Sequence, residues 1–174
     1  MPEHFCINWI NFKMSLRKKP WNRTNQPVYA VSTRMGDERN MHIVSYVTPI
    51  SMNPKQYIVG LYHGTKSLEL AEQSPCFALQ LLREEQYPLI RLLGQQSGHT
   101  INKIQRLQKR KLLSVWHDFF ILKDALAVLL LNCRLTFEGG DHRGFLCDVT
   151  DYTNLNEGTP LTLDYLRAKK IIRG

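Results

Sequence analysis

The sequence lacks the cysteine patterns that build metal sites and disulfide scaffolds. Its 174 residues include four cysteines, and none forms a C-x-x-C pair or has a histidine at metal-ligand spacing. We therefore predict no metal site. Because three of the four stand in apolar, strand-like surroundings, we expect them to be buried free thiols. Free thiols are typical of proteins in the reducing cytoplasm, so we expect a cytoplasmic location. The four are Cys6, Cys76, Cys133 and Cys147.

Long apolar runs are missing as well. The longest, Ala125 to Leu131, falls far short of the ~18 residues needed to cross a bilayer, so no membrane span is expected. The N-terminus is interrupted by Asn8, Asn11 and Lys13 and does not predict a signal peptide. Motifs of the G-x-G-x-x-G, P-loop and H-E-x-x-H types are absent, which gives no support to the enzyme classes that depend on them.

The charge balance is basic, with a formal net charge of +8. Part of it lies in Arg17–Lys19, and part in the cations between positions 103 and 111. A basic surface concentrates anions in general, so it fits a phosphate-bearing cofactor and nucleic acid alike. We interpret the cations at 103–111 as solvated helix surface.

The organisation of the chain indicates one domain with a preceding extension. Pro20, Asn22, Asn25 and Pro27 forbid a long regular element near the start, so residues 1–26 are predicted to be an N-terminal extension. Residues 27–174 are long enough to bury a core of their own and are predicted to form the folded domain.

Short strands dominate the pattern within that domain. A hairpin turn is indicated at residues 138–141, short helices are predicted at 67–73, 87–93 and 100–113, and Thr100 or Ser97 could cap the last of them. The tail from Leu161 to Ile172 could be a strand or a helix. Without a regular strand–helix–strand repeat, an antiparallel barrel is favoured over a doubly wound sheet. Strands are expected at 28–33, 41–52 (one strand or two halves around Pro49), 57–62, 77–82, 125–137 and 144–149.

The most informative segment runs from Asn40 to Lys66. Hydroxyl residues recur in its strand-like part, and Lys66 follows the next strand between Thr65 and Ser67. Such a stretch can offer backbone N–H groups and hydroxyls along one edge, with a positive charge beyond it. This inventory suits a flat, polar-edged ligand that carries a phosphate, such as flavin mononucleotide (FMN).

At these residues the chain resembles the flavin reductase family with the FMN-binding split β-barrel fold. The resemblance runs from about Pro27 to Val149, and several motifs occur in the family's order. They are Asn40-Met41, the stretch from Ser45 to Pro54, Thr65-Lys66-Ser67, Ser97-Gly98 with Asn102-Lys103, Asn132-Cys133-Arg134, and Gly140-Asp141-His142. The resemblance implies a mainly β fold, a split antiparallel barrel of Greek-key type with a few short flanking helices.

The resemblance also implies an activity and a site. FMN would lie near the interface of a homodimer, NADH or NADPH would supply a hydride, and a flavin-dependent protein could accept the reduced flavin. His142 would lie near the flavin or the nicotinamide. The cofactor-binding residues would be Asn40, Ser45, Tyr46, Val47, Thr48, Ile50, Ser51, Met52, Thr65, Lys66 and Ser67. The chain departs from the family pattern at His42, where many members have threonine, and at Asn53-Pro54-Lys55, which replaces a frequent double proline.

Two other functions stay open. The same fold could serve as a non-enzymatic FMN carrier or an electron-transfer module. A small basic barrel that binds nucleic acid is the third hypothesis, but the basic stretch at 103–111 lacks the interleaved aromatic residues that stacking on bases requires.

Overall fold

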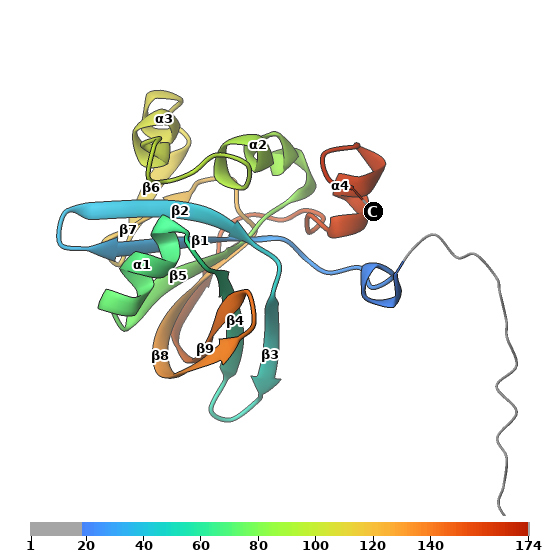
Figure 1. The fold of residues 1–174 in the computed structure, drawn as a ribbon. Coiled ribbons are helices and arrows are strands. Elements are labelled where there is room, and N and C mark those ends of the chain that lie inside the picture. The colour runs from blue at the N-terminus through green and yellow to red at the C-terminus, as the bar shows by residue number, and fades with distance from the viewer. Residues whose placement is uncertain (1–18, 174) are drawn as a thin grey trace, which may run out of the picture.

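The computed structural model of the protein describes residues 19–173. Within them, short helices and turns surround a sheet of long antiparallel strands (Figure 1). The helices are α1 (Lys66–Gln73), α2 (Ile90–Leu93), α3 (Lys103–Lys109) and α4 (Leu163–Ala168), with 3-10 turns η1 (Pro20–Asn22) and η2 (Glu84–Leu89). The strands are β1 (Tyr29–Met35), β2 (Glu38–Val44), β3 (Val47–Ser51), β4 (Gln56–Tyr62), β5 (Cys76–Leu81), β6 (Leu113–Trp116), β7 (Phe119–Leu122), β8 (Ala127–Gly139) and β9 (His142–Asn154).

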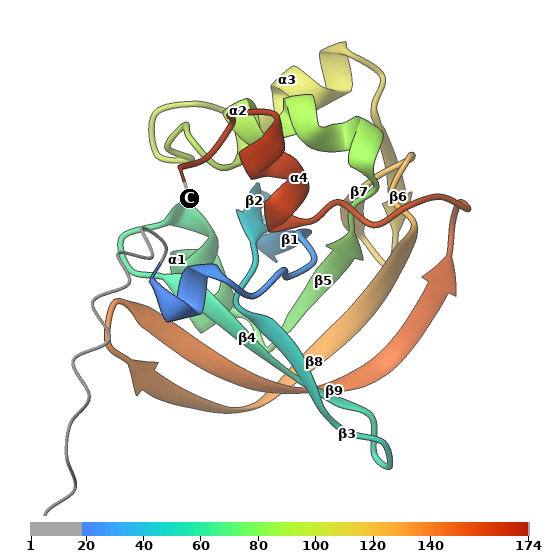
Figure 2. The same cartoon turned by 90° about the vertical axis from the view of Figure 1, so that its right-hand side faces the viewer.

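Seven strands form one antiparallel sheet in the order β2-β1-β5-β8-β9-β4-β3. Strands β2 and β3 are neighbours in sequence but stand at opposite edges of this sheet, so the sheet must roll until its edges approach. Tyr46, in the connection between the two edges, extends the β3–β4 pairing, because its carbonyl accepts a hydrogen bond of 2.7 Å from Gly60 N. Figure 2 shows the long β8–β9 hairpin curving beneath the crossing strands β3 and β4. The predicted split antiparallel barrel is confirmed.

The core is divided by the sheet. Inside the roll, Phe77 and Phe145 meet edge to face with their ring centroids 5.7 Å apart. On the other side, α2, α3 and α4 pack apolar side chains such as Leu93, Leu107 and Leu166 against the sheet. Helices α2–α4 therefore cover one end of the barrel, as both views show (Figures 1 and 2).

A buried polar network attaches the β6–β7 hairpin to this sheet. Gln80 Oε1 accepts a hydrogen bond of 2.6 Å from Leu122 N, and Gln80 Nε2 donates one of 2.9 Å to Ser32 Oγ. The Ser32 hydroxyl in turn donates to Phe120 O at 2.7 Å. Side chains from β1 and β5 thus satisfy backbone groups of β7.

Most of the predicted elements are present, with two corrections. The helix expected at 100–113 covers only Lys103–Lys109, and its cap is Asn102, whose Oδ1 accepts a hydrogen bond of 2.9 Å from Gln105 N. Residues 113–122 form a hairpin that was not predicted. Its turn uses His117 and Asp118, both with positive φ (47° and 62°), where a turn of this kind usually carries Asn-Gly.

The structure also decides points that the sequence left open. The stretch at 41–52 is two strands separated by Ser45 and Tyr46, and the tail contains a helix, α4, capped by the Thr162 hydroxyl. Of the expected buried thiols only Cys147 is fully buried, because Cys76 and Cys133 are half-exposed. Cys6 and most of the predicted extension lie outside the described residues, and the domain boundary at 27 stays a prediction. No helix in residues 19–173 is long and apolar enough to span a membrane.

Candidate functional site

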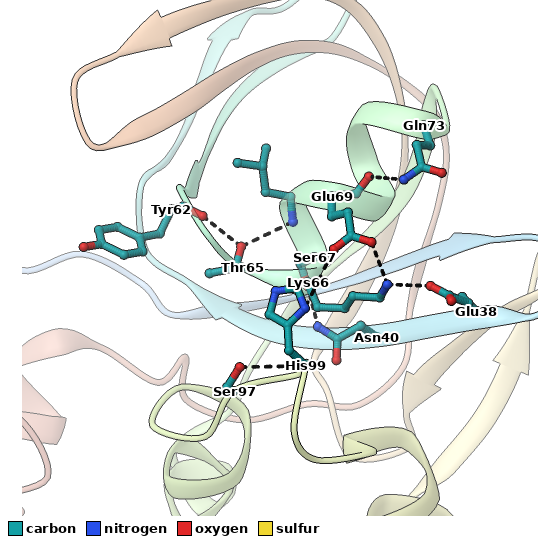
Figure 3. Close-up of polar contacts among 11 residues, drawn as sticks. Glu38, Asn40, Tyr62, Thr65, Lys66, Ser67, Glu69, Gln73, Ser97 and His99 are labelled. Carbon is teal, nitrogen blue, oxygen red and sulfur yellow. Dashed lines mark hydrogen bonds and ion pairs between the residues drawn. The ribbon is translucent and has the colours of Figure 1, made fainter.

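A cavity of about 350 Å³ lies between the start of α1 and the loop that follows α2. We call it the lysine cavity. The loop before α1 turns at Gly64, whose φ of 73° favours glycine. Thr65 then caps the helix, because its Oγ1 accepts a hydrogen bond from Leu68 N and donates one of 2.8 Å to Tyr62 O (Figure 3). The walls are formed by Asn40, His42, Tyr62, His63, Gly64, Thr65, Lys66, Gly94, Gln95, Gln96, Ser97, Gly98 and Lys103.

Lys66 is held by two carboxylates at the rim of this cavity. Its Nζ lies 2.5 Å from Glu38 Oε2 and 2.7 Å from Glu69 Oε1 (Figure 3). The hydrogen bonds that Lys66 donates to Glu38 and Glu69 raise the pKa of Lys66 above its usual value, so the ammonium stays charged. The predicted point charge is therefore present, but it is already shared between two anionic partners.

Asn40 forms part of the inner wall, with Ser67 behind it. Both are buried, and Asn40 Nδ2 donates a hydrogen bond of 2.9 Å to Ser67 Oγ. The loop at Gly98 packs directly on Asn40, because a Cβ added to Gly98 would lie only 2.7 Å from Asn40 Oδ1. A larger residue at this position would therefore have to displace the Asn40 amide or the loop. Ser67, predicted as a phosphate contact, lies behind Asn40 and is fully buried.

Lys103 corrects the interpretation of the stretch 103–111 as solvated surface. Its side chain is only 2% exposed, and its Nζ donates a hydrogen bond of 2.8 Å to Leu93 O. Burial lowers its pKa to about 8. A signal for this was present in the sequence, because positions 103 and 107 are one helical turn apart and share the face that Leu107 buries.

His42 was noted in the sequence only as a departure from the family pattern. Its Nδ1 is buried with no hydrogen-bond partner among the described residues. Burial, followed by the charges of Lys103 and His142, lowers its pKa to about 4, so the imidazole is neutral at pH 7. A neutral imidazole offers one donor and one acceptor nitrogen.

A second cavity, of about 320 Å³, lies against β3, β4 and the β8–β9 turn. We call it the histidine cavity. Tyr46, Val47 and Thr48 line one side and His142 the other. His142 Nδ1 lies 2.6 Å from Asp141 Oδ1, and the Tyr46 ring lies 4.4 Å from the imidazole centroid. The carboxylate therefore orients the imidazole and leaves Nε2 as the nitrogen available to a ligand.

The two cavities are neighbours. Tyr62 lines the lysine cavity, and its ring meets the edge of His142, which lines the histidine cavity, at a centroid distance of 5.3 Å. His42 is close enough to Lys103 and to His142 for both charges to affect its pKa. Groups that suit an anion and groups that suit a flat ring therefore lie side by side.

The predicted site residues fall into three sets. Asn40, Thr65 and Lys66 line the lysine cavity, with Ser67 behind them, and Tyr46, Val47, Thr48 and His142 line the histidine cavity. The remaining four lie along or beside β3, which is an edge strand of the sheet. They line neither cavity, and Ile50 and Met52 are 49% and 83% exposed. Their role stays a prediction. The four are Ser45, Ile50, Ser51 and Met52.

An antiparallel sheet rolled in this way defines a split β-barrel protein. A family model described as "Flavin reductase like domain" matches residues 21–170. The chain belongs to this flavin reductase-like family.

Similar proteins extend this comparison. A curated protein, the high molecular weight rubredoxin of Moorella thermoacetica, is 26% identical over 144 residues, which are 82% of this chain and 62% of that protein. The chain thus spans under two thirds of that relative's length.

Three solved structures have the same fold. An FMN-binding protein from Thermus thermophilus with bound 1-cyclohex-2-enone superposes with a TM-score of 0.70 at 20% identity, covering 78% of this chain and 74% of that chain. An NADH:FAD oxidoreductase from Streptomyces globisporus gives 0.71 at 18% identity, covering 80% and 81%. A flavoredoxin from Methanosarcina acetivorans gives 0.67 at 15% identity, covering 87% and 79%.

Proposed function

We propose that this chain binds FMN across the lysine and histidine cavities and catalyses hydride transfer from NADH or NADPH to the flavin. The observation that carries the proposal is the adjacency of the two cavities in a member of the flavin reductase-like family. Their chemistry matches the two ends of FMN, a phosphate monoester and a flat tricyclic ring.

The lysine cavity fits the phosphate end. It combines two lysines with the Thr65 hydroxyl and the Asn40 amide, and such groups form charge-assisted hydrogen bonds with a phosphate. The buried Nδ1 of His42, in the wall of the same cavity, adds a nitrogen without a hydrogen-bond partner among the described residues. We expect Thr65 to lie at the phosphate end, as the resemblance implied, with Ser67 supporting it from behind Asn40.

The histidine cavity fits the ring. Tyr46 and Val47 provide apolar surface, and Thr48 lies beside them on the edge strand β3. We expect backbone N–H groups between Ile50 and Met52 to face the pyrimidine side of the ring, where preorganised dipoles stabilise negative charge. When bound, FMN supplies the hydride acceptor, and the protein binds and orients the reactants.

His142 is the residue proposed to act on the nicotinamide side. Asp141 fixes its Nδ1 at 2.6 Å, and Tyr46 and Tyr62 pack against its ring, so Nε2 is held in one direction. We expect this nitrogen to hydrogen-bond the bound reactants and align them. Alignment of two reactants contributes to rate because the entropy of bringing them together is already lost on binding.

A homodimer belongs to the same proposal. Large apolar side chains stand exposed on the β3–β4 and β8–β9 hairpins, where Met52 is 83% and Tyr152 70% exposed. Exposed apolar surface on two neighbouring hairpins is typical of a protein–protein contact. A two-fold contact through these hairpins would cover the β3 edge. Light scattering coupled to gel filtration tests it, since a monomeric mass at micromolar concentration would contradict the dimer.

The decisive experiment is a spectroscopic titration of the full-length protein. FMN added to the purified protein is expected to remain bound through gel filtration, and NADH or NADPH added without oxygen is expected to bleach its visible absorbance. Protein that stays colourless after incubation with FMN would refute flavin binding. Bound flavin that neither nicotinamide bleaches would refute the reductase activity alone.

Replacement of His142 tests its assignment. His142→Ala is expected to slow NAD(P)H oxidation by at least about tenfold, equivalent to about 1.4 kcal/mol of transition-state stabilisation. His117→Ala is the matched control, because His117 also pairs with an aspartate at 2.6 Å, Asp151, but lines neither cavity. Equal rates for the wild type and His142→Ala would remove His142 from the mechanism.

A second candidate is an FMN-containing electron-transfer module. The curated relative that favours it is named a rubredoxin and is longer than this chain. The bleaching experiment separates the two, because a carrier would bind FMN but would be reduced by a protein partner instead of by NAD(P)H. In either case, the reduced flavin or its electrons would pass to an acceptor protein.

A further inference from the structure

The lysine cavity contains two lysines, Lys66 and Lys103, which differ in whether their charge is already paired with carboxylates of the protein. Lys66 Nζ already lies 2.5 Å from one carboxylate oxygen and 2.7 Å from another. A phosphate that approached Lys66 would also approach Glu38 and Glu69. Repulsion from these carboxylates would offset much of the attraction.

Lys103 has the opposite surroundings. Its ammonium is buried and donates to Leu93 O at 2.8 Å, and no carboxylate within residues 19–173 lies at ion-pair distance from it. An ammonium has three N–H donors, so two are left without a protein acceptor in this part of the chain. A buried charge without a counter-ion is unfavourable, and an anion in the cavity would relieve that cost.

The groups beside Lys103 are suited to the same anion. Lys103 lines the cavity together with Asn40, His42 and Thr65. His42 is the neutral imidazole whose Nδ1 is buried without a partner among the described residues. Two carboxylates at the rim, Glu38 and Glu69, are both paired with Lys66. The inner part of the cavity therefore carries a positive charge without a counter-ion among the described residues, whereas the rim carries two carboxylates for one ammonium.

We propose that Lys103, and not Lys66, is the principal anchor for the phosphate monoester of the ligand, with the His42 imidazole as an accompanying hydrogen-bond partner. The inference rests on the proposed function and assigns the phosphate end of FMN to one cation. Lys66 then orders the rim, where it ties α1 to β2 through Glu38.

Riboflavin and FMN differ only in the phosphate, so their affinities isolate this contact. The full-length apoprotein is titrated with each flavin, following the quenching of flavin fluorescence, for wild type, Lys103→Met and Lys66→Met. Lys109→Met is the matched control, an exposed lysine on the same helix. We expect Lys103→Met to weaken FMN binding by about 10- to 100-fold, as for the loss of one or two charge-assisted hydrogen bonds, and to change riboflavin binding by less than about threefold.

Two further measurements guard against a folding artefact. Lys103→Arg keeps the charge and is expected to retain part of the preference for FMN over riboflavin. Inorganic phosphate is expected to raise the melting temperature of the wild-type apoprotein and of Lys109→Met but not that of Lys103→Met. A Lys103→Met protein that has lost its native circular dichroism would be replaced by Lys103→Gln in the same titration.

The outcomes separate this inference from the proposed function. Wild-type protein that binds neither flavin would overturn both. Protein that binds both flavins equally, or that keeps its preference for FMN in Lys103→Met, would overturn the role of Lys103 and leave flavin binding intact. Loss of the preference in Lys66→Met alone would assign the phosphate to Lys66 instead.

Discussion

Histidine 42 makes the stability of this protein sensitive to mild acid in a way that one substitution should remove. Its pKa is about 4 in the folded protein, against an ordinary value of 6.5, because of burial and then the charges of Lys103 and His142. As pH falls through 6.5 the unfolded chain takes up the proton first. Folding stability contributed by the neutral imidazole is therefore complete above pH 6.5 and is lost progressively towards pH 4.

The size of the effect follows from the shift. A difference of 2.5 pKa units corresponds to about 3 kcal/mol over the whole range, and about 2 kcal/mol of this falls between pH 7 and pH 5. Glutamine cannot take up a proton in this range. Between pH 7 and pH 5 the free energy of unfolding of His42→Gln is therefore expected to fall by about 2 kcal/mol less than that of the wild type. Urea unfolding of the apoprotein at the two pH values measures the difference.

Other groups that titrate in this range cancel in the comparison, because both proteins carry them. His99→Gln is the control for the replacement of a histidine by glutamine, since the His99 side chain is 43% exposed. Nuclear magnetic resonance gives a direct check, in which the His42 ring should titrate near pH 4 and at a higher pH in Lys103→Met. An equal loss of unfolding free energy in the wild type and in His42→Gln would refute the reasoning, and so would a His42 ring that titrates near pH 6.5.

Two further substitutions test the framework around the site. Gln80→Leu removes the acceptor of the Leu122 N–H and the donor to Ser32 Oγ. We expect this substitution to lower the free energy of unfolding, measured in urea, by about 1–3 kcal/mol. A loss below about 0.5 kcal/mol would mean that water replaces the side chain. Gly98→Ala places a methyl group 2.7 Å from Asn40 Oδ1, so we expect a loss of about 1–3 kcal/mol together with weaker FMN binding. Unchanged stability and FMN affinity would show that the loop moves freely away from Asn40.

The parts of the fold that were predicted from the sequence are those decided by local chemistry. The turn at Gly139 and Gly140 was predicted, and Gly140 adopts the positive φ (75°) that glycine permits. The strands on either side of it were predicted because apolar and β-branched residues alternate or cluster there. The β6–β7 hairpin was not predicted, because His117 and Asp118 occupy left-handed positions where a sequence usually signals a turn with glycine or asparagine.

Most of the predicted residues that line the two cavities belong to one continuous stretch of sequence. Asn40, Tyr46 and Thr65 are examples, and His142 is the exception, since the resemblance to the family also pointed to its distant turn. The position of Lys103 in the cavity wall depends on a contact between α3 and the carbonyl of Leu93, ten residues earlier, and the neighbouring Gly98 loop folds back on Asn40 of β2. Neither contact leaves a pattern in the local sequence.

Composition misleads at Lys103 for a physical reason. Lysine is rarely buried without a partner, so a lysine within a basic stretch is expected to be solvated, even though its spacing from Leu107 places it on the apolar face of α3. A buried charge that the described residues do not neutralise makes folding less favourable, and such a residue is expected where binding requires it. We therefore expect the Lys103→Met apoprotein to be at least as stable as the wild type, and its affinity for FMN to be lower. This opposite movement of stability and affinity distinguishes a binding residue from a structural one.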